Sequence, residues 1–220
     1  MLLKIYILLF SLNFASELSG RYYNAMDKGI KMFKSCKTEE DFLKTSNYFY
    51  RISQVSKNDW LSSYYYAYCN TSLSMMQDDL DIKELYLEKA YEIIAPFDSL
   101  KISNIDSVAI SEINTLKALI YVGKIFINPM INGMKYGPLS EKSINKAIRY
   151  CPQNPRPYYL NGQSKYYTPS AFGGGVDKAM PLLKKSLDNY KIFKSKKHWP
   201  DWGEDECQLL YKKAKNNEKK

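Results

Sequence analysis

The feature that most constrains the fold is a pair of helical segments separated by prolines, between Gly137 and Leu187. In the first segment, small or apolar residues recur at the spacings i, i+4, i+7 and i+11, namely Ser140, Ile144, Ala147 and Cys151. This spacing places them on one helical face, where small side chains let a second helix approach closely. Pro152 predicts the end of this helix, because proline has no amide hydrogen and disfavours a helical residue before it.

The second segment begins at a pair of prolines, Pro155 and Pro157. Both fit the first turn of a new helix, where a missing amide hydrogen costs little. Gly162 follows inside this helix, although a glycine there costs about 1 kcal/mol relative to alanine. We therefore expect Gly162 to lie where two helices of a hairpin cross closely.

These residues resemble the tetratricopeptide repeat, a helical hairpin of about 34 residues with small and bulky residues at fixed offsets. Ser140, Ile144, Ala147 and Pro152 match the second half of one repeat, and Tyr158 and Gly162 match the opening of the next. The second helix of that next repeat is matched by Ala179, Leu183 and Ser186. Gly162 and Ala179 lie 17 positions apart, about five more than the pattern allows.

The additional residues fall in the stretch from Tyr167 to Gly175, which contains Phe172 and three consecutive glycines. This stretch resembles the Phe-Gly-Gly loop of periplasmic TatT-like proteins, which are tetratricopeptide components associated with TRAP-type transporters. The resemblance implies a role linked to a substrate-binding transporter. The residues alone predict a turn with positive φ, because the stretch lacks the Gly-Lys-Ser/Thr sequence of a phosphate-binding loop.

The fold class predicted for the chain is all-α, a right-handed α-solenoid of about four degenerate tetratricopeptide-like hairpins. With 220 residues, of which 45% are hydrophobic, the chain is long enough to form a sizeable core. We expect the repeat domain over residues 21–203 and a terminal helix with a basic tail over residues 204–220. Pro129 and Gly133 predict a loop from Asn128 to Tyr136.

Residues 1–20 are typical of a cleaved secretory signal peptide. Lys4 precedes an apolar run from Ile5 to Leu12, which is too short to span a bilayer, and small residues follow. The alternative is a buried N-terminal helix. The signal predicts a periplasmic or secreted protein that does not span the membrane.

Candidate catalytic and metal-binding residues are few. The single histidine, His198, lacks the clustered partners that a metal site or a histidine-dependent triad needs, so we predict no metal, no cofactor and no enzyme activity. No C-x-x-C motif is present. The cysteines are buried free thiols or form disulfides whose pairing the sequence leaves open, and they are Cys36, Cys69, Cys151 and Cys207.

Aromatic residues supply the candidate binding site. The chain has 20 tyrosines, and aromatic residues are densest between Trp60 and Tyr68. Such side chains either form core or line the concave groove in which helical repeats hold ligands or peptides. The groove residues that we predict are Trp60, Tyr64, Tyr68, Tyr158, Tyr166 and Phe172.

Two functions are compatible with these observations. The first is an exported, non-enzymatic scaffold that binds a protein or peptide partner in the cell envelope. The alternative is a periplasmic component that binds an apolar small molecule and is linked to a transporter, as the TatT-like resemblance implies. The net charge of +9 would suit nucleic acid, but export and the concentration of lysines in the tail argue against a nucleic-acid partner.

Overall fold

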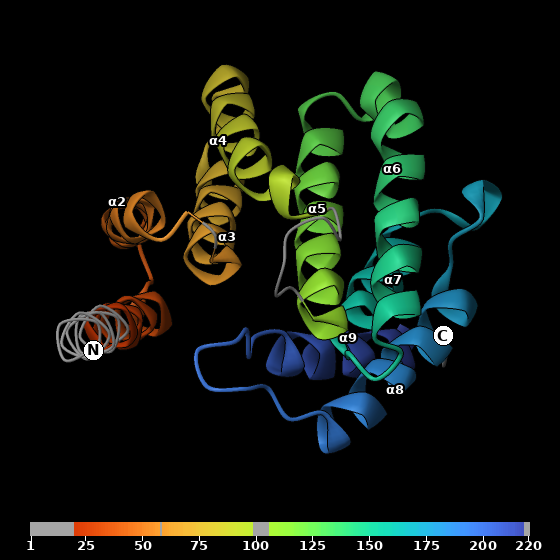
Figure 1. Cartoon of the computed structure of the whole chain (residues 1–220). Coiled ribbons are helices and arrows are strands. Elements are labelled where there is room, and N and C mark those ends of the chain that lie inside the picture. Colours follow the sequence, from red (N-terminus) through yellow and green to blue (C-terminus); the bar gives the residue numbers. More distant parts are fainter. Residues whose placement is uncertain (1–19, 58, 99–105, 218–220) are drawn as a thin grey trace, which may run out of the picture.

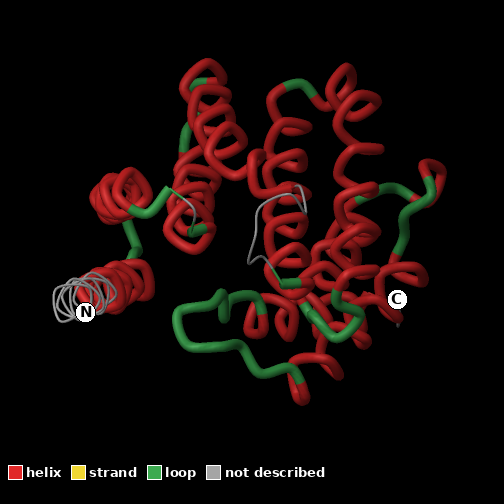
Figure 2. The backbone as a smooth tube through the Cα atoms, in the orientation of Figure 1, coloured by secondary structure: helices red, strands yellow, loops and turns green. Residues whose placement is uncertain are grey.

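A computed structural model describes residues 20–57, 59–98 and 106–217, and all regular elements in these residues are helices, as predicted (Figures 1 and 2). Residues 20–35 are the described part of the first helix. The elements that follow are α2 (Glu39–Val55), α3 (Trp60–Met76), α4 (Leu80–Ile94), η1 (Ala95–Asp98), α5 (Ser107–Ile127), α6 (Pro129–Tyr150), α7 (Arg156–Tyr167), η2 (Ser170–Phe172), α8 (Val176–Ile192) and α9 (Glu204–Asn217).

Helices that follow one another in sequence pack against one another as hairpins, namely α3 with α4, α5 with α6 and α7 with α8. The hairpins are placed in chain order across the molecule (Figure 1). Helix α5 is central, because it contacts α3 and α4 on one side and α6 and α7 on the other. The handedness of a solenoid and the tetratricopeptide assignment stay predictions.

The hydrophobic core has two parts that meet at α5. The first part is centred on Phe49, Tyr65 and Leu87, and the second contains Leu160 and Leu183. Leu119 of α5 packs against both parts. The helix can serve both because buried residues occur on nearly all of its faces.

The loop predicted from Asn128 to Tyr136 is wrong, since α6 begins at Pro129. Proline is favourable at the first helical position, where its missing amide hydrogen leaves no bond unmade. The side chain of Asn128 caps the helix by accepting a hydrogen bond from the amide of Ile131 at 3.3 Å. The proline and the glycine of this stretch therefore lie within a helix, and only one residue separates α5 from α6.

The close crossing predicted at Gly162 is confirmed. A β-carbon added to Gly162 would lie 2.7 Å from Leu183 Cδ2 and 3.2 Å from the backbone nitrogen of Leu183. Both distances are shorter than van der Waals contact. The glycine is therefore needed for the contact between α7 and α8.

Replacing Gly162 with alanine is expected to lower the free energy of unfolding by about 1–2 kcal/mol, because overpacking outweighs the better helix propensity of alanine. Gly133 provides a matched control, since a β-carbon there meets nothing within 4 Å. Alanine at Gly133 should leave stability unchanged or raise it by about 0.5–1 kcal/mol. Urea unfolding measures both changes, and an equal response of the two variants would contradict the packing argument.

In the part of the chain that the structure describes, no helix is both long and apolar enough to cross a bilayer. The predicted signal peptide falls almost entirely in residues 1–19, which lie outside the described residues. The signal peptide and its cleavage therefore stay predictions.

Candidate functional site

Three of the six predicted groove residues lie together on α3. Trp60, Tyr64 and Tyr68 are spaced four residues apart and therefore share one helical face. The ring centroids of Trp60 and Tyr64 are 5.7 Å apart in an edge-to-face arrangement, and those of Tyr64 and Tyr68 are 6.5 Å apart. These three side chains are therefore neighbours on α3.

This face is covered by residues 193–203, which connect α8 to α9 and which we call the crossing segment (Figure 2). Trp199 packs edge-on against Trp60 at 4.8 Å, and Trp202 lies 5.2 Å from the ring of Tyr68. The indole N–H of Trp202 donates a hydrogen bond to the Tyr64 hydroxyl at 2.9 Å. Trp60 and Tyr64 are consequently buried, and a ligand role for them stays a prediction.

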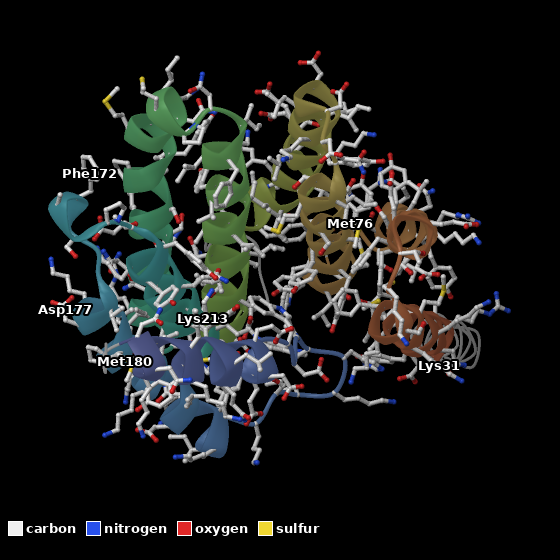
Figure 3. The ribbon with its side chains drawn as sticks, turned by 180° about the vertical axis from the view of Figure 1, so that it is seen from behind. Lys31, Met76, Phe172, Asp177, Met180 and Lys213 are labelled. Carbon is white, nitrogen blue, oxygen red and sulfur yellow. The ribbon has the colours of Figure 1, made fainter. Side chains whose placement is uncertain are left out.

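The other three predicted residues lie elsewhere. Tyr158 and Tyr166 are on α7, and Phe172 is in η2. The hydroxyl of Tyr166 accepts a hydrogen bond from Asn217 at 2.7 Å, close to the end of α9. Phe172 is exposed and lies at the opposite side of the molecule from Met76, the last residue of α3 (Figure 3). The six residues therefore do not form one groove.

A buried ion pair ties the crossing segment to the core. Arg156 Nη1 lies 2.8 Å from Glu112 Oε1, and the same oxygen accepts a hydrogen bond from Asn154 at 3.0 Å. Arg156 also donates to the carbonyl oxygen of Pro200 in the crossing segment. Burial raises the pKa of Glu112, and the positive charge of Arg156 opposes this shift. The pair joins α5, α7 and the crossing segment, and we assign it a structural role.

His198 contacts two residues of the first helix. Its Nε2 lies 2.7 Å from Asp27 Oδ1, and its ring stacks on Tyr23 at 5.5 Å. The hydrogen bonds from His198 and Lys197 lower the pKa of Asp27. Within the described residues, no group of three or more His, Cys, Asp or Glu side chains could hold a metal ion. All four cysteines are free thiols, and Cys69, Cys151 and Cys207 are buried.

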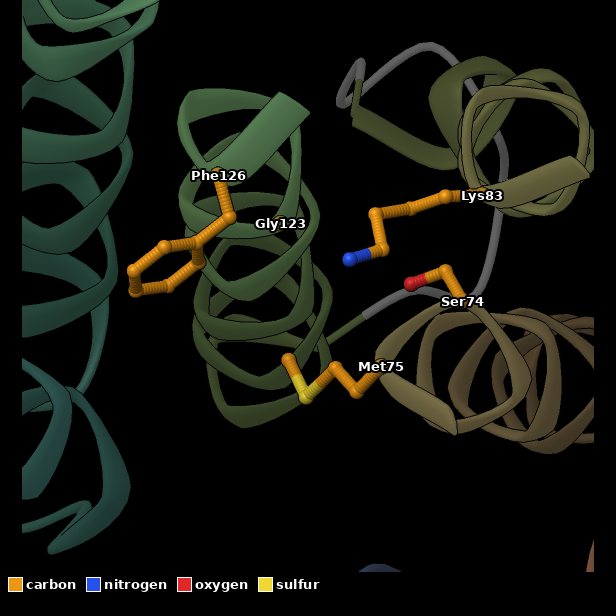
Figure 4. Close-up of a pocket in the computed structure, with 5 residues that line it drawn as sticks. All are labelled: Ser74, Met75, Lys83, Gly123 and Phe126. Carbon is orange, nitrogen blue, oxygen red and sulfur yellow. The ribbon is translucent and has the colours of Figure 1, made fainter. Parts of the chain in front are cut away.

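An open pocket lies where α3 and α5 end and α4 begins (Figure 4). Its volume is about 370 Å³, and we call it the α3–α5 pocket. The residues that line it are Ser74, Met75, Lys83, Gly123 and Phe126. Met75 and Phe126 are more than half exposed, so apolar surface is available to a ligand. The ammonium of Lys83 projects into the space between the three helices (Figure 4).

Gly123 sets the shape of this pocket. A β-carbon on Gly123 would lie 2.6 Å from Cδ2 of Leu87, so glycine allows α5 to approach α4 closely there. Sequence reasoning missed all five lining residues. The available signals were a glycine inside the apolar pattern of α5 and large apolar residues at helix ends, Met75 and Phe126.

Further exposed apolar side chains lie on stretches that are close in sequence to the lining residues. They belong to the last residue of α3, the first turn of α4 and the first turns of α6, and each is at least 41% exposed: Met76, Leu80, Ile82, Met130, Ile131 and Met134. Concave apolar surface with few polar groups is common in ligand sites, and exposed apolar side chains also mark surfaces that bind proteins or membranes.

Comparison with known proteins is informative among solved structures. No protein-family model matches the chain, and no curated protein matches it. Among solved structures, the HusA haemophore from Porphyromonas gingivalis is similar, with a TM-score of 0.77 and 29% sequence identity. The match covers 89% of this chain and 94% of that chain. The chain thus shares the helical fold of a haemophore, which is a binding protein.

Proposed function

We propose that this protein is an exported, non-enzymatic binding protein that carries a flat, largely apolar ligand of the porphyrin class. The observation that carries the proposal is the similarity to a haemophore, a protein that carries haem, over nearly the whole of both chains. The similarity supports the binding of a small molecule better than it supports a protein-binding scaffold. Export and a tetratricopeptide-like ancestry are part of the same proposal.

The α3–α5 pocket supplies the chemistry that such a ligand requires. Its volume of about 370 Å³ is near the lower end of ligand pockets, so it would hold one edge of a porphyrin. Phe126 offers an aromatic ring and Met75 a polarizable thioether. Methionine is also one of the side chains that bind haem iron.

The proposal is tested by titrating the mature protein with haemin and with protoporphyrin IX while following the porphyrin absorption band. We expect saturable binding of one porphyrin per chain. Replacing both Met75 and Phe126 with alanine should weaken binding at least about tenfold, because partial burial of each side chain contributes about 1 kcal/mol. Leu209→Ala is a matched control, since Leu209 is exposed on α9, away from the pocket. Absence of saturable binding by the wild-type chain would contradict the proposal.

A further inference from the structure

Lys83 is the one titratable residue that lines the α3–α5 pocket. It is partly buried, and its ammonium projects into the cavity from α4 (Figure 4). Within the described residues, no carboxylate forms an ion pair with it. A positive charge beside apolar side chains is therefore available to a group that enters the pocket.

Lys124, the residue after Gly123 on α5, differs from Lys83 because it has charged and aromatic partners. Its ammonium forms an ion pair with Glu88 and lies 5.4 Å from the ring centroid of Tyr91 and 5.5 Å from that of Tyr136. Lys124 is only 5% exposed. The chain thus supplies a carboxylate and two aromatic faces to the lysine that it buries at this end, and it supplies no carboxylate to Lys83.

The acidic residues of α4 do not neutralise the pocket. Asp81 and Glu84 are exposed, and with 3.6 residues per turn they lie about 200° and about 100° away from Lys83 around the helix axis. Glu84 and Glu88 act electrostatically on Lys135 of α6. The negative charges of α4 are therefore directed toward α6 and solvent, and the ammonium of Lys83 is the charged group that faces the cavity.

We propose that Lys83 binds a carboxylate of the ligand, so that the α3–α5 pocket selects flat apolar molecules that carry a free acid at one edge. This inference rests on the proposed function and specifies its ligand chemistry. The apolar part of the ligand packs on Met75 and Phe126, and its carboxylate accepts hydrogen bonds from Nζ of Lys83. Recognition by charge at the ligand's edge does not depend on a metal at its centre.

The test is a two-by-two comparison of ligand and protein. Protoporphyrin IX and its dimethyl ester have the same ring, but the ester carries no charge. Each is titrated into the wild-type chain and into Lys83→Met, which keeps an unbranched side chain of similar size. We expect wild type to bind the acid about tenfold more tightly than the ester, and Lys83→Met to bind both as weakly as wild type binds the ester.

Lys89→Met is the matched control, because Lys89 is exposed on the same helix with its ammonium over the ring of Tyr86 at 5.5 Å. This variant should keep the preference for the acid. Equal binding of acid and ester by wild type would overturn the assignment of Lys83 while leaving the proposed function standing. Binding of neither compound by wild type would overturn both. A preference for the acid that persists in Lys83→Met would show that another cation makes the contact.

Discussion

Replacing Arg156 with methionine is expected to lower the free energy of unfolding by about 3–5 kcal/mol. Arg156 and Glu112 are each 1% exposed, so the substitution leaves a carboxylate without its cation in the protein interior. The hydrogen bond to the carbonyl oxygen of Pro200 is lost as well, which removes one contact between α7 and the crossing segment. Urea unfolding followed by circular dichroism measures the change.

Two further variants separate the effect of the unpaired charge on stability from the effect of the changed packing. Arg156→Met combined with Glu112→Leu removes both charges and should recover most of the loss, because apolar residues of similar volume replace a buried ion pair well. Arg149→Met should have little effect, since Arg149 is exposed and forms no ion pair among the described residues. If Arg156→Met alone were as stable as wild type, the structural role that we assign to the pair would be contradicted.

The loss in Arg156→Met should also depend on pH. Burial raises the pKa of Glu112, and removal of the opposing charge of Arg156 raises it further. Between the ordinary carboxyl pKa and this raised value, the folded state binds more protons than the unfolded state, so stability increases as the pH falls through that range. The deficit should therefore be smaller at about pH 5 than at about pH 8. If the stability deficit of Arg156→Met did not change with pH, the unpaired Glu112 carboxylate would not be its cause.

Replacing Trp202 with alanine is expected to lower the free energy of unfolding by about 3 kcal/mol, or the melting temperature by about 6–12 °C. Trp202 packs against Tyr68, donates a hydrogen bond to Tyr64 and lies 5.7 Å from the guanidinium of Arg156. These contacts hold the crossing segment against α3 and the core.

Trp202→Phe should lower the free energy of unfolding by less, about 1 kcal/mol, because phenylalanine keeps an aromatic ring and removes the hydrogen bond to Tyr64. Tyr167→Ala serves as the control, since Tyr167 is exposed. Thermal unfolding should then rank wild type and control above Trp202→Phe, and Trp202→Phe above Trp202→Ala. Equal melting temperatures for all four proteins would show that the crossing segment is only loosely attached.

Local features of the fold could be predicted from the sequence because their physical causes are local. Thr38 caps α2 and forms a capping box with Asp41, as its position before three acidic residues indicates. Asp106 precedes α5 and caps it by accepting a hydrogen bond from the amide of Ala109 at 2.8 Å. The start of α6 was missed because proline and glycine were weighed as loop formers, although Pro129 occupies the first helical position.

The candidate site could not be predicted, because it depends on contacts between distant parts of the chain. Trp202 and Tyr64 are 138 residues apart, and no local pattern indicates that one covers the other. Glu112 likewise finds its partner 44 residues away. Whether the aromatic residues of α3 form core or line a groove was therefore open from the sequence, and the crossing segment buries Trp60 and Tyr64. The α3–α5 pocket instead arises where the ends of three helices meet.

The most direct test of ligand binding at this pocket is methyl NMR of the mature protein with 13C-labelled methionine, titrated with the diamagnetic ligand zinc protoporphyrin IX. Porphyrin ring currents shift nearby methyl signals, and the methionines report on separate regions. Met75 lines the pocket, Met26 is buried in the core and Met180 lies on α8. We predict a saturable shift of the Met75 signal, with those of Met26 and Met180 unchanged. A Met75 signal that stays in place at saturating ligand would contradict binding at the α3–α5 pocket.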